Sequence, residues 1–327
     1  MKVSLNLAQE FSNVDLKSIP REELLKRIGA QLGAVEDVID WAPKFKGAVI
    51  VRVTDCGKHP DADKLSVCQV DDGSGKTVQV VCGAPNVKAG MYAVWLPVGV
   101  VVPNSLDKDP FKLEARPIRG VVSNGMLASA HELGISDDHT GIVEITPEDA
   151  GKEPVPGEPL IKYCGLDDLV VDCENKMFTH RPDCFGNLGV ARELAGIFGL
   201  RFKSPGWYYD ELKIEPGSGL ALEVKNEISE LVPRFMAVAM KGVVIKPSPL
   251  WLQATLARVG IKPINNVVDV TNYVMHQAGQ PLHAFDYDKL KERSGSTSLM
   301  ARMSKKGEKL TLLGNKEISL SGEEIVI

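Results

Sequence analysis

The chain has 327 residues, of which 44% are hydrophobic and 25% are charged, a composition typical of a globular protein with room for two or three domains. Its 38 Lys and Arg residues are outnumbered by 43 Asp and Glu residues. The formal net charge of -5 argues against a general nucleic-acid binder, because neutralising phosphates normally needs a basic excess. Any contact with RNA must therefore be local.

The sequence carries no charged-then-apolar secretion signal, and its longest apolar run, near Met91 to Val102, is short and interrupted by Pro97. We therefore expect a cytoplasmic protein with no membrane contact. The cysteines form no CxxC pair, which favours free thiols in a reducing compartment. They are Cys56, Cys68, Cys82, Cys164, Cys173 and Cys184.

The first forty residues predict a short extended piece and a turn, followed by a helix that begins after Pro20. Leu24, Ile28 and Leu32 form one apolar stripe on this helix. Forty residues cannot close a core alone, so we expect this segment to pack on a later part of the chain.

From Phe45 to Thr146 the pattern changes to short strands with alternating apolar residues. These residues are Val49, Val51, Val53, Val67, Val70, Val78, Val80 and the run from Tyr92 to Leu96. The sequence DDGSGK between two of the strands predicts a hairpin, because its glycines supply positive φ angles. Several short strands with Gly-rich turns and little helix predict a small closed or nearly closed β-barrel.

The predicted barrel is not basic. Between Phe45 and Gly151 there are ten Lys and Arg residues against fourteen Asp and Glu residues, and none of the ten follows Arg119. The candidate phosphate contacts lie in or near predicted loops and are Lys58, Lys64, Lys76 and Lys88. The alternative is that these lysines form a solvated face on a barrel that only packs or positions other parts.

Two possible metal sites are disfavoured. Asp61 and Asp63 lack the later oxygen ligands of a calcium loop, so we interpret them as turn and capping residues. A zinc site would need Cys and His residues whose spacing here matches none of the usual ligand pairs. These residues are Cys164, Cys173, His180 and Cys184.

The segment from Glu148 to Pro159 predicts a stiff connector that leaves the barrel, because it contains three prolines. A strand is predicted at LVVDCEN. An amphipathic helix follows, with its apolar face at Val190, Leu194, Ile197 and Phe198.

After Leu220 the sequence predicts strands at ALEVKN and RFMAVAMKGVVI, a helix from Pro249 to Val259, and a hairpin with a turn at Gly314 and Asn315. The last residues, EEIVI, predict a strand without a partner. Because a chain seldom stops on an apolar strand inside a sheet, we expect this chain to be the amino-terminal part of a longer subunit.

The stretch from Pro263 to Asp286, PINNVVDVTNYVMHQAGQPLHAFD, departs furthest from an ordinary surface. The 26 residues between Lys262 and Lys289 contain no Lys, Arg or Glu. Helical spacing predicts a helix with an apolar side and a polar side, ended by Gly279 as the C-cap and by Pro281. The apolar side is Val267, Val270 and Val274, and the polar side is Asn265, Asp269, Asn272 and His276.

Short polar side chains lower helix propensity unless they hydrogen-bond to a fixed group, so the polar side predicts the wall of a pocket. A structural alternative is open. In it, Asn265 or Asn266 caps the helix, Asp269 and Asn272 fix a neighbouring loop, and His283 is a core histidine.

Several motifs resemble one known family. HPDADKLSVCQVD, VVCGAPNV and RGVVSNGMLAS, in that order, resemble the tRNA-binding OB-fold module of tRNA ligases and their accessory proteins. PINNVVDVTNYV followed by GQPLHAFD resembles the editing module in the β subunit of bacterial phenylalanine-tRNA ligases. The resemblance covers essentially the whole chain.

This resemblance implies an α+β multidomain fold. A small α+β domain would carry an inserted OB-fold β-barrel and would be followed by an incomplete α/β editing module. The implied domains are residues 1–39 with 152–203, then 40–151, then 204–327.

The resemblance also implies a function. In that family the α subunit attaches phenylalanine to tRNA with ATP and magnesium, and the β subunit binds tRNA and hydrolyses tyrosyl-tRNA made in error, within an α2β2 heterotetramer. A pocket built to hydrogen-bond the tyrosine hydroxyl strongly rejects phenylalanine, which explains the need for a second site. Matched by motif, the pocket-lining residues are Thr271, Asn272 and Pro281, with Asn265 and Asp269 on the polar side, and His283 is the candidate catalytic histidine.

The glutamate that reads the tyrosine hydroxyl in that family lies beyond Ile327, so we expect the isolated chain to be inactive in hydrolysis. Two alternatives remain open. One is a tRNA-binding or scaffold module without enzymatic activity. The other is an unrelated small-molecule hydrolase that uses Asp269 and His283, which the barrel motifs disfavour.

Overall fold

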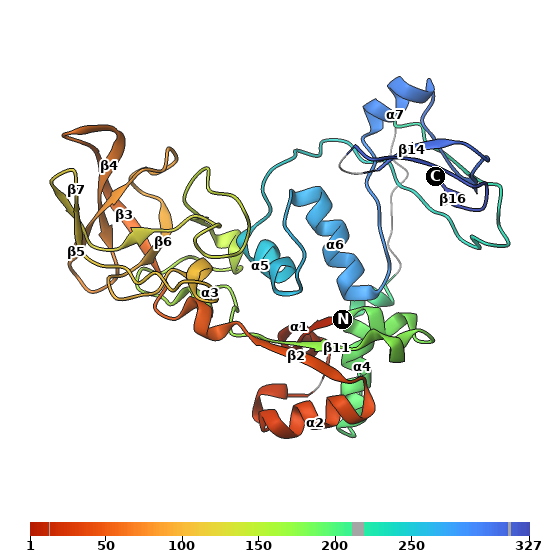
Figure 1. Cartoon of the computed structure of the whole chain (residues 1–327), viewed down its shortest axis with the longest axis horizontal. Coiled ribbons are helices and arrows are strands. Elements are labelled where there is room, and N and C mark those ends of the chain that lie inside the picture. Colours follow the sequence, from red (N-terminus) through yellow and green to blue (C-terminus); the bar gives the residue numbers. More distant parts are fainter. Residues whose placement is uncertain (13, 211–218, 313–314) are drawn as a thin grey trace. The chain divides into compact units, whose positions relative to one another are not determined.

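The structure is a computed structural model and describes residues 1–12, 14–210, 219–312 and 315–327 (Figure 1). The chain divides into two compact units. The first unit comprises Met1–Tyr209 and Ile245–Leu282, and the second comprises Asp210–Val244 and His283–Ile327. Helices and strands occur in both units, so the predicted α+β multidomain class is confirmed.

The first unit contains a three-stranded antiparallel sheet in the order β1-β11-β2. Its strands are β1 (Lys2–Ser4), β11 (Leu169–Cys173) and β2 (Val35–Asp40). Val171 on the central strand lies opposite Val3 on one neighbour and Val38 on the other. The first forty residues therefore pack on a later segment, as the sequence predicts.

Three helices share a core with this sheet: α1 (Leu5–Glu10), α2 (Arg21–Gln31) and α4 (Asn187–Ile197). The predicted helices α2 and α4 are confirmed, and both bury the expected apolar stripe. Helix α1 was not expected, because the sequence predicts an extended piece and a turn there. Ser4 caps it by accepting a hydrogen bond from the N–H of Leu7. Leu5 and Ala8 pack into a core closed by residues far along the chain, and this packing stabilises a helix too short to form alone.

A six-stranded sheet follows in the order β10-β6-β3-β4-β5, with β9 also paired to β6. The strands are β3 (Val49–His59), β4 (Ala62–Asp71), β5 (Thr77–Cys82), β6 (Tyr92–Leu96), β9 (Met126–Leu127) and β10 (Glu144–Ile145), beside a separate ribbon of β7 (Arg116–Ile118) and β8 (Val121–Ser123). All the strands predicted between Val49 and Leu96 are confirmed. The DDGSGK hairpin is confirmed too, because Asp71 pairs with Thr77 and Gly73 and Gly75 have φ of 78° and 81°.

The two sides of this sheet approach each other. Gln79 on β5 accepts a hydrogen bond from the N–H of Asn124 at 3.0 Å, and Ser123 Oγ accepts one from the N–H of Val81 at 3.0 Å. Because β9 begins just after Asn124 and pairs with β6, the sheet curls nearly back on itself. Its interior is apolar, with Val51, Val53, Val70, Val80, Ala93 and Leu127 buried.

Helices α3 (Leu160–Tyr163) and α5 (Leu250–Arg258) also belong to the first unit. Leu160, Leu250 and Ala254 share a buried cluster with Ile50 and Leu96 of the six-stranded sheet. The predicted helix after Pro249 is thereby confirmed. The described residues also form short 3-10 helices at Leu16–Ser18, Ala42–Phe45, Pro103–Ser105, Pro147–Asp149, Asn175–Phe178, Pro182–Phe185 and Gly206–Tyr208.

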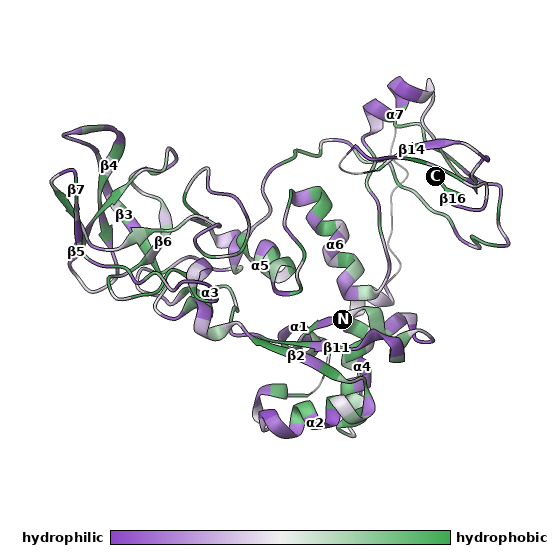
Figure 2. Cartoon of the chain, in the orientation of Figure 1, coloured by the Kyte–Doolittle hydropathy of each residue, from purple (hydrophilic) through white to green (hydrophobic). Residues whose placement is uncertain are grey.

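The second unit has a three-stranded sheet, a hairpin and one helix in its described residues. The sheet is β12 (Glu223–Asn226), parallel to β13 (Ser298–Met303), which pairs antiparallel with β16 (Ile325–Val326). The hairpin is β14 (Lys309–Thr311) with β15 (Glu317–Ser319), and the helix is α7 (Tyr287–Ser294). Helix α7 buries no residue and is largely hydrophilic (Figure 2).

Two predictions for this unit are wrong. The segment RFMAVAMKGVVI forms no strand, and Met236, Val238 and Met240 along it are exposed. Its apolar alternation is strand-like, but a strand needs a neighbouring backbone, and none of the described strands pairs with it. The final EEIVI is not without a partner, because Ile325 pairs with Met303. For the predicted turn, Asn315 has φ of 61°, while Gly314 lies outside the described residues.

Candidate functional site

Helix α6 (Asn266–Ala278) lies in the stretch that the sequence marks as a pocket wall. Asn265 caps its first turn, since Oδ1 accepts hydrogen bonds from the N–H groups of Val267 and Val268, each at 3.1 Å. Gly279 ends the helix with φ of 70°, and its N–H donates to the Met275 carbonyl at 2.8 Å. The predicted helix and its C-cap are confirmed, and Asn265 serves as a cap.

The two fully buried residues of α6 are polar. Asp269 and Gln277 are 1% and 4% exposed, whereas the neighbouring Val270 is 48% exposed. Asp269 Oδ2 accepts a hydrogen bond from Ser248 Oγ at 2.6 Å, and Oδ1 accepts one from the N–H of Ile264 at 2.8 Å. Both carboxylate oxygens therefore fix the segments that lead into the helix. For Asp269 this agrees with the alternative stated from the sequence, in which it holds a neighbouring loop.

The other predicted pocket residues are more exposed than Asp269 and form fewer hydrogen bonds. Thr271 is half-buried and its hydroxyl donates to the Val268 carbonyl at 2.7 Å. Asn272 is half-buried too, and its side chain forms no hydrogen bond with the described residues. Pro281 is exposed after the C-cap. On the same helix, burial lowers the pKa of His276, so its imidazole is neutral at physiological pH.

His283, the candidate catalytic histidine, is exposed and belongs to the second unit, where its ring centroid lies 4.5 Å from that of Phe285. Asn265, Asp269, Thr271 and Asn272 belong to the first unit and lie together on or next to one helix. The structure thus groups four of the predicted pocket residues, with Pro281 just beyond the helix, and assigns the histidine to the other unit.

The four candidate RNA-binding lysines surround the six-stranded sheet and are all exposed. Lys58 and Lys64 flank the tip of the β3–β4 hairpin, and Lys76 precedes β5. Lys88 lies between β5 and β6 and its Nζ is 3.3 Å from Glu144 Oε1. Of the four, only Lys88 forms an ion pair with the described residues, so the other three cations are available to an anion.

Two arginines of the β7–β8 ribbon, Arg116 and Arg119, were not predicted from the sequence as RNA contacts. His59 Nε2 lies 3.0 Å from the Ile118 carbonyl oxygen, which joins the tip of the β3–β4 hairpin to the β7–β8 ribbon. Arg116 and Arg119 on this ribbon are exposed and form no ion pair within the described part of the chain. The signal was the RPIRG turn, whose two arginines flank a hairpin. Together with Lys58 and Lys64 these arginines form what we call the basic end of the sheet, where the exposed Asp61 and Asp63 also lie at the hairpin tip.

A cavity of about 310 Å³ opens beside the basic end, and Arg116 and Ile118 are among its lining residues. Phe111, which is 51% exposed, also lines it. Glu132 contributes a fixed carboxylate, since its Oε2 accepts hydrogen bonds from the N–H of Ser129 at 2.7 Å and from the Ser129 hydroxyl. The cavity therefore joins an exposed aromatic ring, a free guanidinium and an anchored acceptor.

No group of His, Cys, Asp or Glu among the described residues is arranged to hold a metal ion. Cys173 and Cys184 are buried in the core of the N-terminal sheet, and burial raises the pKa of each thiol to about 11. Asp61 lies in the turn between β3 and β4, where its N–H donates to His59 Nδ1 at 3.0 Å.

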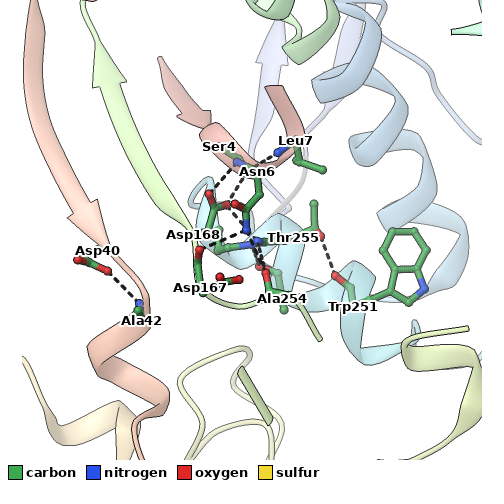
Figure 3. Close-up of polar contacts among 12 residues, drawn as sticks. Ser4, Asn6, Leu7, Asp40, Ala42, Asp167, Asp168, Trp251, Ala254 and Thr255 are labelled. Atoms are coloured by element: carbon green, nitrogen blue, oxygen red, sulfur yellow. Dashed lines mark hydrogen bonds and ion pairs between the residues drawn. The ribbon is translucent and has the colours of Figure 1, made fainter. Parts of the chain in front are cut away.

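A buried ion pair that the sequence did not indicate fixes α5 to the N-terminal sheet (Figure 3). Arg258 Nη1 lies 3.0 Å from Asp168 Oδ2, and the two side chains are 5% and 0% exposed. Asp168 also accepts hydrogen bonds from Ser4 Oγ at 2.6 Å and from the N–H of Asn6 at 3.0 Å. Arg258 donates further to the Gly165 carbonyl and to Thr255 Oγ1. This pair is a structural feature rather than part of a site.

In the described residues, no helix combines the length and the apolar character needed to cross a bilayer.

Comparisons with known proteins agree with the positions of these features. Residues 48–153 match a family described as a putative tRNA binding domain, and residues 231–327 match the B3/4 domain family. The C-terminal domain of Plasmodium vivax p43 is a similar solved structure at 22% identity over 24% of this chain and 43% of that chain, but its TM-score of 0.19 supports no structural argument.

Relatives match the whole chain. It is 36% identical over 333 residues to the phenylalanine–tRNA ligase beta subunit of Staphylococcus aureus strain MSSA476, covering 100% of this chain and 39% of the relative. It is 38% identical over 331 residues to the beta subunit of Pectobacterium atrosepticum, covering 100% of this chain and 38% of the relative. The chain thus spans about two fifths of the length of these relatives. Over its whole length the chain is therefore similar to part of the phenylalanine–tRNA ligase beta subunit, and it carries a putative tRNA binding domain followed by a B3/4 domain.

Proposed function

We propose that this chain supplies tRNA binding and hydrolytic editing of tyrosyl-tRNA to a phenylalanine–tRNA ligase, while an α subunit attaches phenylalanine. The support is the order of its parts, a putative tRNA binding domain followed by a B3/4 domain in a chain whose relatives are beta subunits of this ligase. The observation that carries the tRNA-binding role is the basic end beside the cavity, which lies within residues 48–153.

The surrounding assembly follows from the same family. The α subunit and the phenylalanine-specific tRNA are the proposed partners, in an α2β2 heterotetramer located in the cytoplasm. ATP and magnesium serve the complete enzyme. We assign no magnesium-binding role to the residues of this chain.

We assign the six-stranded sheet to the OB-fold barrels. Its near closure through Gln79 and Asn124 and its apolar interior support this assignment. The domain boundaries proposed are residues 1–39 with 152–203, then 40–151, then 204–327. The pairing of β11 with both β1 and β2 supports the discontinuous first domain. Residues 245–282, which include α5 and α6, belong to the same compact unit as the first two proposed domains.

The basic end and the cavity suit an unpaired nucleotide. Arg116 and Arg119 would neutralise phosphates, and the ring of Phe111 would stack on a base. Glu132 Oε1 has no hydrogen-bond partner among the described residues and would accept from an exocyclic amine of the base. Because only a few cations take part, sequence-independent attraction stays weak, which fits the acidic balance of the chain.

Substitution of Phe111 tests this role. A base stacked on an aromatic ring contributes about 1–3 kcal/mol, so Phe111→Ala should weaken tRNA binding by roughly 5- to 150-fold. Tyr209→Ala is the matched control, because Tyr209 is 72% exposed and lies outside residues 48–153. Binding is measured by fluorescence anisotropy with labelled phenylalanine tRNA. Equal affinities of the two variants would remove Phe111 from the interface.

For editing, the described residues offer positioning groups and no nucleophile. From the motif PINNVVDVTNYV and Pro281 we propose that Thr271, Asn272 and Pro281 line a pocket, with Asn265 and Asp269 holding the helix start. From the motif GQPLHAFD we propose His283 as the residue that orients or deprotonates the attacking water. Hydrolysis then proceeds by direct attack of that water on the ester carbonyl.

The complete α/β enzyme carrying His283→Ala should still attach phenylalanine but should clear tyrosyl-tRNA about 10²- to 10⁴-fold more slowly, the usual contribution of a general acid or base. Deacylation of preformed tyrosyl-tRNA is the measurement, and phenylalanylation by the same sample is the control for folding. Unchanged clearance would show that His283 is only structural. The chain alone should bind tRNA without hydrolysing tyrosyl-tRNA; selective hydrolysis by the chain alone would instead show that residues 1–327 contain a complete pocket.

A further inference from the structure

Two thiols lie next to each other on neighbouring strands of the six-stranded sheet. Cys56 on β3 and Cys68 on β4 are direct cross-strand partners in antiparallel register, and their Sγ atoms lie 3.5 Å apart. Residues directly opposite in antiparallel strands have Cα atoms about 4.5–5.5 Å apart. That spacing lies within the range of about 4.4–6.8 Å that disulfides span. The register and the distance between the two sulfur atoms therefore suit a disulfide between these strands.

The surroundings of the two thiols differ. Cys68 is fully buried and burial raises the pKa of its thiol, so it stays protonated. Cys56 is half-buried and is the thiol that a small oxidant reaches first. The third cysteine of the sheet, Cys82 on β5, is out of register, because its cross-strand partner is Ser66 and the partner of Cys68 is Val80.

We propose that Cys56 and Cys68 are a site of reversible oxidation, at which hydrogen peroxide converts the two free thiols into a cross-strand disulfide. The Cys56 sulfur attacks the peroxide O–O bond, giving a sulfenic acid and one water. The Cys68 sulfur then attacks the Cys56 sulfur, the S–S bond forms, and the sulfenic oxygen leaves as a second water with the Cys68 proton. The thiols lose two protons and two electrons, and a dithiol reductant reverses the reaction.

The position of the pair gives the modification a physical effect. A bond between residues 56 and 68 closes the β3–β4 hairpin, whose tip carries Lys58 and Lys64 and contacts Ile118. Cross-linking restricts the unfolded chain and so stabilises the sheet against unfolding. The six cysteines are free in the structure, which corresponds to the reduced state. This inference stands on the geometry of the sheet and not on the tRNA-binding role.

The test treats the folded 327-residue chain with hydrogen peroxide, blocks the remaining thiols with an alkylating reagent, and maps peptides by mass spectrometry without reduction. We expect two of the six thiols to be lost, with the Cys56 and Cys68 peptides joined and two hydrogen atoms missing, and we expect a dithiol reductant to restore all six. Cys56→Ser should abolish the joined peptide, while the control Cys164→Ser, at a half-buried thiol outside the sheet, should retain it.

Three outcomes overturn the proposal: alkylation of both Cys56 and Cys68 after treatment, oxidation of either one alone to a sulfinic acid, or a link from either one to Cys82. If Cys56→Ser does not fold, the peptide map of the unsubstituted chain decides between these outcomes. A sample oxidised after unfolding supplies the comparison, since its cysteines should link without preference for this pair.

Discussion

Asp167 and Asp168 are neighbours in sequence and have opposite surroundings. Asp167 pairs with Lys17 at 2.7 Å, and both side chains are about half exposed, at 50% and 52%. Asp168 is buried, with Arg258, Ser4 and Asn6 around its carboxylate. Water screens the first pair, whereas loss of the second carboxylate charge leaves a guanidinium buried without its counter-ion.

We therefore predict that Asp168→Asn lowers the free energy of unfolding of the first unit by about 3–5 kcal/mol, whereas Asp167→Asn lowers it by less than about 1 kcal/mol. Urea unfolding followed by circular dichroism compares the two variants with the unsubstituted chain. Similar midpoints for both variants would mean that the buried pair does not hold α5 to the N-terminal sheet.

At the residue scale the sequence indicated which side chains are unusual but not what they do. In the polar stripe on α6, Asn265 and Asp269 are hydrogen-bonded to fixed groups as predicted, whereas the Asn272 side chain forms no hydrogen bond with the described residues. The partner of the stripe turned out to be the chain itself, because Asp269 binds Ser248 and Ile264. Composition cannot distinguish a carboxylate that holds a loop from one that faces a ligand, since both need short polar groups on a rigid helix.

Gly279 ends helix α6 and needs a backbone conformation that other residues rarely adopt, unlike Gly196 inside helix α4. Gly279 has φ of 70°, and a Cβ there would lie 3.0 Å from the Pro182 carbonyl oxygen. Gly196 in α4 has a helical backbone, and a Cβ there would meet nothing within 4 Å.

Replacing each glycine by alanine should therefore have opposite effects. Gly279→Ala should cost about 1–2 kcal/mol through left-handed backbone strain, and the crowding against Pro182 adds to it. Gly196→Ala should stabilise by about 0.5–1 kcal/mol, because alanine has less conformational freedom to lose in a helix. Thermal unfolding of both variants measures the difference, and a shift in the same direction for both would contradict the assigned C-cap.

Elements with a clear local sequence pattern were predicted correctly, whereas two segments whose structure depends on distant residues were not. The α6 caps, the DDGSGK hairpin and the strands from Val49 to Leu96 follow from local residues. Helix α1 forms because a core closed more than a hundred residues later buries Leu5 and Ala8. The segment 234–245 alternates like a strand and is not one, because pairing depends on a neighbour that sequence alternation does not supply.

On the scale of the whole molecule, the proposed tRNA contact of this acidic chain is confined to one small region. From the sequence, four lysines in or near predicted loops were selected as phosphate contacts, and Arg116 and Arg119 were not. The structure joins their ribbon to the β3–β4 hairpin through His59 and Ile118, which gathers charges that are far apart in the chain. A local basic end of this kind predicts few phosphate contacts and a shallow dependence of affinity on salt.

The salt dependence of tRNA binding tests this claim most directly. Each neutralised phosphate contributes about 0.7–0.9 to the slope of log affinity against log salt concentration, so the unsubstituted chain should show a slope of about -2 to -4. Arg116→Ala with Arg119→Ala should reduce its magnitude by roughly 1–2, while Arg52→Ala, an exposed arginine of β3 outside the cavity lining, should leave it unchanged. An unchanged slope in the double variant, or a steep slope that all three arginines share equally, would contradict a local basic end as the tRNA contact.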